Sequence, residues 1–574
     1  MAEQQQRGAR VAPGDGAATA PEAQETPGAR TAAATDGPDE LEEQAERSSN
    51  AVSIIVIISR VTGFFRTTLQ AWALGAGGIA SAYTVANNLP NTLYELVMGG
   101  MLVTAFLPVY LNVKKRAGRE GANEYTSNLL SIVGIFLAIV CVLCMVCASP
   151  IIWTQSVGAD EAFETELAVW LFRWFACEIL LYALSSLFSG ALNAEREYIW
   201  SNAAPIFNNM ITILSFVLYG YLVEYAGVAW NTAAIVLAIG NPLGVLVQVL
   251  VQMPSMRKRG IRLRLHVDLS DPALRETLSI GLPTLVVTFA STITTTVMSS
   301  SSLAATASGA SISYYARVWY VLPYSIFAVP ISVTMFTELS ECFSQGALAK
   351  FKEYFANGVR KLFFTLIPFT MYLIVFAPCL VAVFASGRFD EEAVELTVGY
   401  LRTLALALPF HGLCTYLQKT CSAMLKMRFY ALATCLAAAA QVLICVVCTP
   451  VFGLNAVAFS TVVFYGAIDL VTILNLRREL GRLGLGSVVR ATGRALVFGL
   501  AGSLVGQLVL NGLAVLAGPC EGALRGVLYA AAGGIPALLV TFGIAYLMGM
   551  SDAPFFDALF GRAERVAKRL LGRA

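Results

Sequence analysis

The sequence of 574 residues predicts an all-α protein that crosses a membrane many times. The first observation is composition, which is 57% hydrophobic and only 13% charged, against about 25% charge in a typical soluble domain. The second is that the apolar residues form runs long enough for one bilayer crossing each. The third is that features of these runs recur in two halves of the chain. A disordered chain, a secreted disulfide scaffold, a coiled coil and a nucleic-acid-binding domain are thereby excluded.

Fourteen apolar segments are predicted to span the bilayer. Pro90 and Pro323 lie inside the second and the eighth, where a proline removes a helical hydrogen bond, and they are expected to bend or break those helices. The segments are 51–74, 80–112, 125–153, 165–190, 199–223, 228–253, 277–300, 309–343, 354–384, 393–421, 428–450, 453–476, 489–516 and 523–550.

Lys and Arg in the short loops predict the orientation. The loops after the second, sixth and twelfth segments are basic, with KKRAGRE at 114–120, RKRGIRLR at 257–264 and RRELGR at 477–482. The odd-numbered loops are acidic or nearly uncharged, as in DEAFETE at 160–166 and FDEEAVE at 389–395. Because every even-numbered loop is basic, both termini are expected on the cytoplasmic side of the plasma (cell inner) membrane.

The two ends of the chain differ in charge. Residues 1–50 contain ten acidic and four basic residues, and residues 1–48 lack any hydrophobic period, so they are predicted to be a disordered cytoplasmic tail. This tail is interpreted as a solvated spacer, with docking of a partner as the alternative. Residues 551–574 are predicted to form a basic amphipathic tail whose helix lies on the anionic inner leaflet.

An internal repeat divides the span region. Each half would hold six helices, which gives an N-terminal lobe at 49–265 and a C-terminal lobe at 266–485, with two further helices at 486–550. An even number of helices puts both lobes in the same orientation, a build common in secondary transporters with a substrate site between the halves. Chance similarity among apolar helices is the alternative. The paired features are Leu89-Pro90 with Leu322-Pro323, Arg196 and Tyr198 with Arg428 and Tyr430, and Gly227 with Gly453.

Three of the arginines inside predicted spans are candidates for a binding site. Arg60 lies about 15 Å into the first helix and Arg66 about 24 Å, at about 1.5 Å per residue, with Gly63 between them to permit close approach of a helix or ligand. Arg317 lies early in the eighth segment. Together they would make a cationic cavity for an anionic amphiphile such as a lipid pyrophosphate, because a guanidinium forms paired hydrogen bonds with phosphate.

Alternatives remain for each of these arginines. Arg66 and Arg317 would instead extend to the membrane interface, and Arg60 would form a buried ion pair with Glu95. Asp469 and His411 are candidates for ion or proton coupling, with a satisfied buried polar group as the alternative.

Two further features concern polar side chains in the spans. Arg173 and Glu178 share the fourth segment and are expected to pair with other helices. A Ser- and Thr-rich run between 284 and 302 serves either helix packing or a wet path. No metal cluster, nucleotide loop or catalytic motif is found, which favours a transporter over an enzyme.

Several motifs in order along residues 50–480 resemble the MurJ (MviN) family of lipid II flippases in peptidoglycan synthesis, within the MOP superfamily. Each motif is loose, and the ordered set is specific. The motifs are SRVTGFFR at 59–66, GAG at 75–77, AYTVANNLPN at 82–91, FLPVY at 106–110, GALN at 190–193 with Pro205 and Asn208, YYAR at 314–317 with Pro323, GRFDEEAVELT at 387–397 and LALPF at 406–410.

The resemblance implies alternating access through fourteen helices around a central cationic cavity. Arg60 and Arg66 match the family's first-helix arginines, which are thought to engage the lipid II diphosphate, and Arg317 is similar to its eighth-helix arginine, one position displaced. Residues implied to line or gate the cavity are Gly63, Asn88, Pro90, Glu95 and Pro323. The sequence departs from the family pattern at Thr67, Ser81, Tyr94, Glu95 and Gly99.

The resemblance also implies partners and an energy source. The expected partners are lipid II, the bilayer and, through the acidic tail, cell-wall synthesis proteins, without nucleic acid. No cofactor or metal is expected, and a monovalent cation or the membrane potential would supply the driving force. The alternatives are an exporter of another polyprenyl-linked glycan or of drugs, and a non-transporting cell-wall scaffold.

Overall fold

Helices make up all regular secondary structure in residues 38–99, 106–550 and 552–570, the part of the chain that the computed structural model describes. The chain divides into a short unit, Met1–Ala51, and a large unit, Val52–Ala574. Residues 1–37 of the predicted tail lie outside the described residues. From Pro38 onward the chain is already helical, so the tail prediction, which extends to residue 48, runs too far. The residues that follow Pro38 are rich in Glu, Leu, Gln and Ala, which favour helix, and acidic side chains favour a helix N-terminus.

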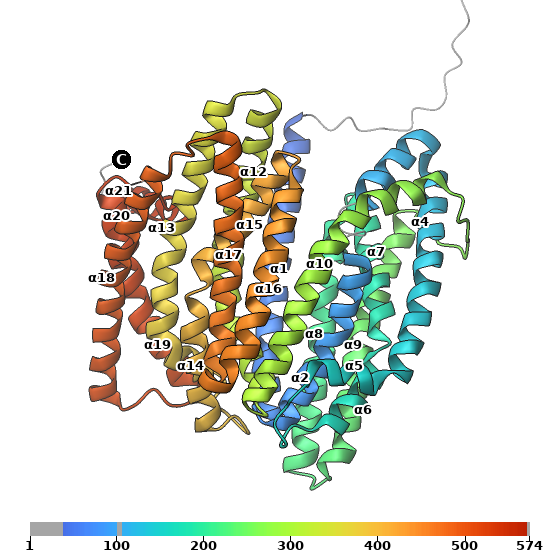
Figure 1. Ribbon diagram of the computed structural model, residues 1–574, viewed down its shortest axis with the longest axis horizontal. Coiled ribbons are helices and arrows are strands. Elements are labelled where there is room, and N and C mark those ends of the chain that lie inside the picture. Colours follow the sequence, from blue (N-terminus) through green and yellow to red (C-terminus); the bar gives the residue numbers. More distant parts are fainter. Residues whose placement is uncertain (1–37, 100–105, 551, 571–574) are drawn as a thin grey trace, which may run out of the picture. The chain divides into compact units, whose positions relative to one another are not determined.

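Helices α2 to α9 form an N-terminal group (Figure 1). Helix α1 contacts this group through Asn209 and the helices of the second half through Trp319, which packs against Phe64. The bounds of these helices are α1 Pro38–Leu74, α2 Gly78–Tyr94, the π-helix η1 Glu95–Gly99, α4 Phe106–Val146, α5 Ala148–Gln155, α6 Thr165–Phe175, α7 Glu178–Ala194, α8 Tyr198–Glu224 and α9 Trp230–Lys258. Helix α4 contains the last part of the second predicted segment as well as the third, and it has non-helical dihedral angles at Gly118.

The remaining helices form a C-terminal group and an appendage. The C-terminal group has α10 Pro272–Ala305, α11 Gly309–Pro323, the π-helix η2 Tyr324–Ala328, α12 Val329–Ser344, α13 Leu348–Val381, α14 Glu391–Ala405, α15 Leu408–Ala423, α16 Met427–Phe452 and α17 Leu454–Leu480. The appendage has α18 Leu485–Ala517, α19 Ala523–Leu538, the π-helix η3 Leu539–Gly543, α20 Ile544–Leu547 and α21 Pro554–Leu570.

The number of membrane spans is set by length and hydropathy. Within the described residues, ten helices are long and apolar enough to cross a membrane, and two bent pairs raise the number to twelve. The bent pairs are α6 with α7, at 41°, and α14 with α15, at 46°. The predicted segments that do not pass are 80–112, part of which is not described, and 277–300, which carries the Ser- and Thr-rich run. The all-α polytopic fold is confirmed, and the count of fourteen stays a prediction.

The same turn occurs within both halves of the predicted repeat, between α7 and α8 and between α15 and α16. Arg196 and Leu425 are the non-glycine residues with positive φ in the described part of the chain, each at 57°. In the first turn the Glu197 amide donates to the Leu192 carbonyl at 2.8 Å, and in the second the Lys426 amide donates to the Cys421 carbonyl at 2.8 Å. Equal backbone geometry at equivalent places supports two six-helix units of common origin.

A π-helical turn follows each of the two span prolines. Pro90 and Pro323 are both buried inside helices. The turn η1 begins five residues after Pro90, and η2 begins directly after Pro323. The span Gly309–Ser344 remains continuous, so Pro323 does not break its helix, and the expected bend stays a prediction.

Helix α10 belongs to neither group alone. It packs against α16, α17 and α11, and also against α4, α5 and η1. The Tyr125 and Thr277 hydroxyls are 2.8 Å apart, and Gln155 Nε2 donates to Thr296 Oγ1 at 2.9 Å. These contacts tie both ends of α10 to the N-terminal group, although the predicted boundary at 265/266 assigns α10 to the C-terminal lobe.

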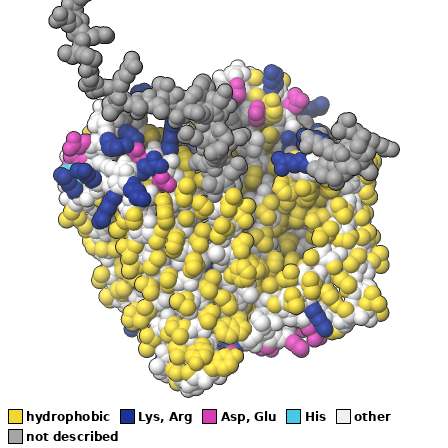
Figure 2. Space-filling model, turned by 180° about the vertical axis from the view of Figure 1, so that it is seen from behind, with side chains coloured by type: hydrophobic (Ala, Val, Ile, Leu, Met, Phe, Trp, Pro, Cys, Tyr) yellow, Lys and Arg dark blue, Asp and Glu magenta, His cyan; other side chains and the backbone are white. Residues whose placement is uncertain are grey.

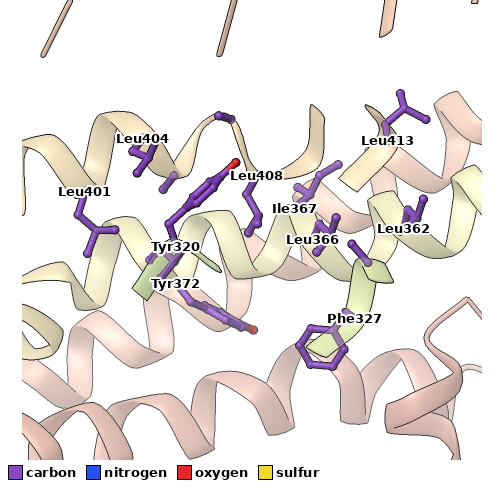
Figure 3. Close-up of a cluster of buried hydrophobic side chains, with 14 of the residues drawn as sticks. Tyr320, Phe327, Leu362, Leu366, Ile367, Tyr372, Leu401, Leu404, Leu408 and Leu413 are labelled. Atoms are coloured by element: carbon purple, nitrogen blue, oxygen red, sulfur yellow. The ribbon is translucent and has the colours of Figure 1, made fainter. Parts of the chain in front are cut away.

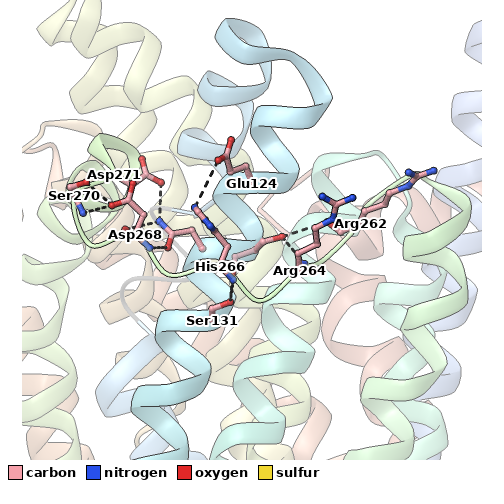
Figure 4. A network of polar contacts seen from close by, with 10 residues as sticks. Glu124, Ser131, Arg262, Arg264, His266, Asp268, Ser270 and Asp271 are labelled. Atoms are coloured by element: carbon pink, nitrogen blue, oxygen red, sulfur yellow. Dashed lines mark hydrogen bonds and ion pairs between the residues drawn. The ribbon is translucent and has the colours of Figure 1, made fainter.

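The extended segment between α9 and α10 lies along α4 (Figure 4). Asn128 of α4 is almost fully buried and accepts from the Asp268 amide at 2.7 Å, while its Nδ2 donates to the Asp268 carbonyl at 2.8 Å and to Asp271 Oδ2 at 3.1 Å. The His266 amide donates to Ser131 Oγ at 3.0 Å. Side chains of α4 thus satisfy backbone groups that have no helical partner.

A second polar cluster joins α4 to the loop after α7. Glu195 accepts from Lys114 Nζ at 2.6 Å and from the Tyr110 hydroxyl at 2.7 Å, and Arg119 lies 3.6 Å away. Burial acts to raise the pKa of Glu195, but the hydrogen bonds from Lys114 and Tyr110 and the charges of Lys114 and Arg119 outweigh it and lower the pKa below its ordinary value. The cluster fixes a predicted cytoplasmic loop.

The C-terminal group has a continuous apolar core. Side chains of α11, η2, α13, α14 and α15 converge in it (Figure 3). Among those labelled, Leu362 and Leu366 of α13 and Leu401 and Leu408 of α14 and α15 are fully buried.

The molecular surface divides by side-chain type. On the face shown in Figure 2, hydrophobic side chains cover the middle and most Lys and Arg side chains gather at the upper end. This distribution suits a bilayer around the middle of the large unit.

Candidate functional site

A polar cavity of about 440 Å³ lies between the two groups of helices. Its walls come from α2 and η1 on one side and from α10, α11, α14 and α17 on the other, with Gln155 of α5. Six hydroxyl side chains of α10 line it: Thr288, Ser291, Thr292, Thr295, Ser299 and Ser302. Of the two interpretations of the hydroxyl-rich run, these six positions favour the wet path. The side chain of Thr284 lies outside the described residues.

Three of the predicted site residues line this cavity directly. Asn88 and Glu95 come from the N-terminal group and Arg317 from α11. All three side chains are exposed. Glu95 Oε1 accepts from Asn91 Nδ2 at 3.3 Å. The cavity therefore has a carboxylate on one wall and a guanidinium on the other.

Arg66 reaches the same region from α1. Its guanidinium is hydrogen-bonded to the Tyr314 hydroxyl, and Tyr83 and Tyr182 are close enough to interact with it. Tyr314 lines the cavity three residues before Arg317, and its hydroxyl is also 3.5 Å from Thr67 Oγ1. The structure thus brings Arg66 into contact with a tyrosine of the cavity wall, although Arg66 is not among the described residues that line the cavity.

Arg60 is placed differently. It lies six residues before Arg66 on α1, it is exposed, and it does not line the cavity as far as the described residues define it. The described ion pairs do not join it to Glu95. Gly63 faces α8, where Asn209 Nδ2 donates to the Ser59 carbonyl at 3.3 Å. A Cβ at Gly63 would stand 3.6 Å from Asn209 Nδ2, an ordinary contact, so this packing does not require glycine.

The two coupling candidates lie behind the cavity wall. The His411 ring stacks on Tyr324 and Tyr465, with ring centroids 3.8 Å and 4.3 Å away. Asp469 is 4% exposed, and neither of its carboxylate oxygens has a hydrogen-bond partner in the described structure. Neither side chain lines the cavity. Among the described residues, no group of three or more His, Cys, Asp or Glu side chains is arranged to hold a metal ion.

Pro90 and Pro323 do not line the cavity either, in the part that is described. Pro323 instead lines a separate apolar groove of about 200 Å³ with residues of α13 and α19, such as Phe376 and Leu538.

Hydrogen bonds close the end of the cavity where the acidic loops lie. We call this contact the seam, formed by Gly75, Ala76 and Ser81 of the N-terminal group with Ser311 and Tyr315 of α11. Ser81 Oγ and Ser311 Oγ are 3.2 Å apart, and the Ser311 amide donates to Ser81 Oγ at 3.3 Å. The Ser311 hydroxyl also donates to the Ala76 carbonyl, and the Tyr315 hydroxyl donates to the Gly75 carbonyl at 2.9 Å.

Sequence reasoning missed the seam, although a signal was present. Ser81 and Ser311 are 230 positions apart, close to the repeat spacing, and equivalent positions meet at the axis of a two-fold repeat. It also missed Tyr314, which stands inside a quoted motif, and Asn241, whose Nδ2 donates to Glu178 Oε1 at 2.9 Å.

Two groups of membrane-spanning helices around a polar cavity that is closed at one end are the arrangement of a multi-pass membrane transporter. The family model described as "Lipid II flippase MurJ" matches residues 70–516, and the chain belongs to this family. A probable lipid II flippase MurJ of Rhizobium meliloti (strain 1021) is 26% identical over 365 residues, which cover 61% of this chain and 65% of that protein. The aligned region therefore spans slightly less than two thirds of that relative's length.

Solved structures show the same fold. A lipid II flippase MurJ in an inward closed conformation superposes with a TM-score of 0.68 at 18% identity, covering 87% of this chain and 99% of that one. A multidrug resistance MATE family transporter of the MOP superfamily, in an inward-facing conformation, gives 0.63 at 16% identity, covering 75% and 98%. The MOP-type fold expected from the sequence is confirmed.

Proposed function

We propose that this protein moves lipid II from the inner to the outer leaflet of the cytoplasmic membrane by alternating access. The observation that carries the proposal is that Arg317 and Tyr314 line a polar cavity shared by both helix groups, while Arg66 contacts the Tyr314 hydroxyl. Family membership supports the substrate. The fold and the family are those of a transporter, and no enzymatic step is proposed.

The chemistry of the cavity suits a diphosphate joined to sugars. Arginine side chains hold phosphate oxygens through paired, charge-assisted hydrogen bonds. The hydroxyls along α10 can donate to and accept from sugar hydroxyls. Arg66 comes from α1 and Arg317 from α11, so a bound diphosphate would be held by side chains of two different helices.

Alternating access requires a second state in which the seam is open. The basic loops support a cytoplasmic position for both termini, which places the seam at the outer end. The closed seam then suits loading from the inner leaflet. Exit would follow when the seam separates and the opposite end closes, with the membrane potential or a monovalent cation restoring the first state.

The test measures lipid II translocation in proteoliposomes with Arg66→Ala and Arg317→Ala. Each variant should lose at least about tenfold in rate, because a charge-assisted hydrogen bond contributes more than about 1.4 kcal/mol. Arg173→Ala is the matched control, since Arg173 is an exposed arginine of α6 away from the cavity. Parental rates in both cavity variants, with normal protein amounts, would contradict the proposal.

Transport of another polyprenyl-linked glycan or of a drug is the second candidate, because a multidrug transporter shares the fold. Competition by other polyprenyl diphosphates at equal concentration separates the two: preference for a different carrier would favour this candidate. A scaffolding role for residues 1–48 toward cell-wall synthesis proteins stays a prediction, tested by deleting the tail and measuring growth and translocation together.

A further inference from the structure

Glu178 is a fully buried carboxyl group inside a membrane span that the proposed transport step does not use. Its side chain is 0% exposed. Asn241 of α9 donates to Oε1 at 2.9 Å, whereas Oε2 has no hydrogen-bond partner. An ionised carboxylate with one oxygen unsatisfied in an apolar interior is costly, so the group is either neutral or compensated by a nearby cation.

The ionisable groups around Glu178 are few and come from three helices. Among the described residues, Arg66 of α1 is the cation that acts on the carboxylate, Tyr182 of α7 is close enough to hydrogen-bond to it, and Tyr83 of α2 is a further neighbouring phenol. Cys177 precedes it in the chain and also interacts with it. The charge that compensates Glu178 is therefore carried by the same guanidinium that reaches the cavity through Tyr314.

The backbone places Glu178 at a special point of its span. It is the first residue of α7, at the 41° bend from α6. The corresponding bend in the other half, at 46° between α14 and α15, is followed by His411, 233 positions later. This offset equals that of the Leu89-Pro90 and Leu322-Pro323 pair. Interrupted helices at equivalent places in two repeats are the sites where secondary transporters hold coupling ions.

We propose that Glu178 is a proton-binding site that controls Arg66, an inference that rests on the proposed function. In one state the carboxyl keeps its proton, and Arg66 is free to hold an anion in the cavity. In the other state the carboxyl O–H bond breaks, the proton passes to cavity water, and the carboxylate left behind pairs with Arg66. Each change of state takes up or releases one proton, and the anion and the carboxylate compete for one guanidinium.

The first experiment measures the protonation of Glu178 in the absence of transport. The full chain in liposomes free of lipid II is treated with dicyclohexylcarbodiimide, which modifies protonated carboxyl groups in apolar surroundings, from about pH 5 to about pH 9. The modified residues are located by peptide mass spectrometry. Glu178 should be modified, with the extent falling about tenfold per pH unit above its midpoint. Asp469 is the internal control, a buried carboxyl with no hydrogen-bond partner.

Arg66→Gln and added anion test the link to the cavity. Removing the guanidinium should move the Glu178 midpoint to higher pH, and vesicles containing undecaprenyl diphosphate should move it the same way in the parental protein. Arg173→Gln should leave it unchanged. Modification of Asp469 but not Glu178 at every pH would overturn the proton site, and an unchanged midpoint in Arg66→Gln would overturn its link to Arg66.

Glu178→Gln separates a proton site from a purely structural contact. A glutamine keeps the hydrogen bond from Asn241 and the side-chain shape but cannot exchange a proton. Lipid II translocation by this variant should lose its dependence on pH, whereas Glu224→Gln, at an exposed position of α8, should behave as the parent. A parental pH profile in Glu178→Gln would refute the inference. Absence of translocation by the parental protein, with Glu178 still modified, would instead refute the proposed function.

Discussion

Replacing Tyr315 by phenylalanine should open the seam more often. The Tyr315 side chain is fully buried, and its hydroxyl donates to the Gly75 carbonyl at 2.9 Å. Phenylalanine keeps the ring and its packing, so the variant removes one hydrogen bond and leaves the buried Gly75 carbonyl without that donor. This loss affects only the state in which the seam is formed.

The size of the shift follows from the loss of one buried hydrogen bond. Leaving a buried acceptor unsatisfied costs about 1–3 kcal/mol. When that cost falls on one of two conformations, their ratio changes by about 5- to 150-fold. Ser311→Ala should act in the same direction, because Ser311 donates to the Ala76 carbonyl and accepts from Ser81.

Pulsed electron resonance can measure the distance between labels at Glu161 and Glu391, which are exposed residues near the acidic end of the two helix groups. The labels need to be non-canonical amino acids, because the chain contains twelve cysteines. In lipid bilayers, Tyr315→Phe should move part of the distance distribution to longer values, whereas Tyr225→Phe, at a 75% exposed position, should not. A distribution identical to that of the parent would refute the assignment of the seam as a gate.

Three further outcomes concern stability in detergent, measured by thermal unfolding. Asn128→Ala should lower the free energy of unfolding by about 2–4 kcal/mol, because it removes up to three hydrogen bonds to the segment before α10. Asn128→Asp should cost at least as much near neutral pH, because it puts a buried carboxylate against the Asp268 carbonyl and Asp271 Oδ2. Glu195→Gln should lower the free energy of unfolding near neutral pH, because the charged carboxylate is stabilised by Lys114 and Arg119. The difference in free energy between variant and parent should vanish as the pH falls below about 4.3 and through the lowered pKa of Glu195. Gly358→Ala should cost about 1–3 kcal/mol, because its Cβ would meet the buried Tyr416 hydroxyl, whereas Gly466→Ala, with open space around it, should be neutral.

The helical fold was predictable because the bilayer imposes it. Apolar runs must be helical when lipid surrounds them, so composition and run length give the spans directly. The bend after Phe175 was not predictable by the same reasoning, because no proline or glycine lies next to it. The bend after Ala405 does have a local signal, since Pro409 stands in the first turn of α15.

The sequence identified individual residues of the candidate site but did not show which of them lie together in the fold. An arginine inside a span is rare enough to be noticed, and Arg66 and Arg317 are indeed close to one tyrosine. The sequence alone does not distinguish Arg66 and Arg317 from Arg60, because the position of a residue along a helix does not tell which face of that helix lies toward the cavity. Glu178 was noticed as a charged residue, but its burial and its link to Arg66 depend on contacts between α1, α7 and α9.

The free energy of the hydrogen bonds in the seam sets how differently a substrate must bind the open and the closed state. The seam consists of four described hydrogen bonds, which contribute together about 2–6 kcal/mol at typical net values. Reversing a two-state equilibrium from about 1:99 to 99:1 requires about 5.5 kcal/mol of differential binding. A ligand that bound both states equally would leave the seam closed however tightly it bound. The proposed diphosphate substrate would therefore have to bind Arg66 and Arg317 more tightly once the helix groups have moved, and the proposed carboxylate at Glu178 would weaken that binding in the starting state.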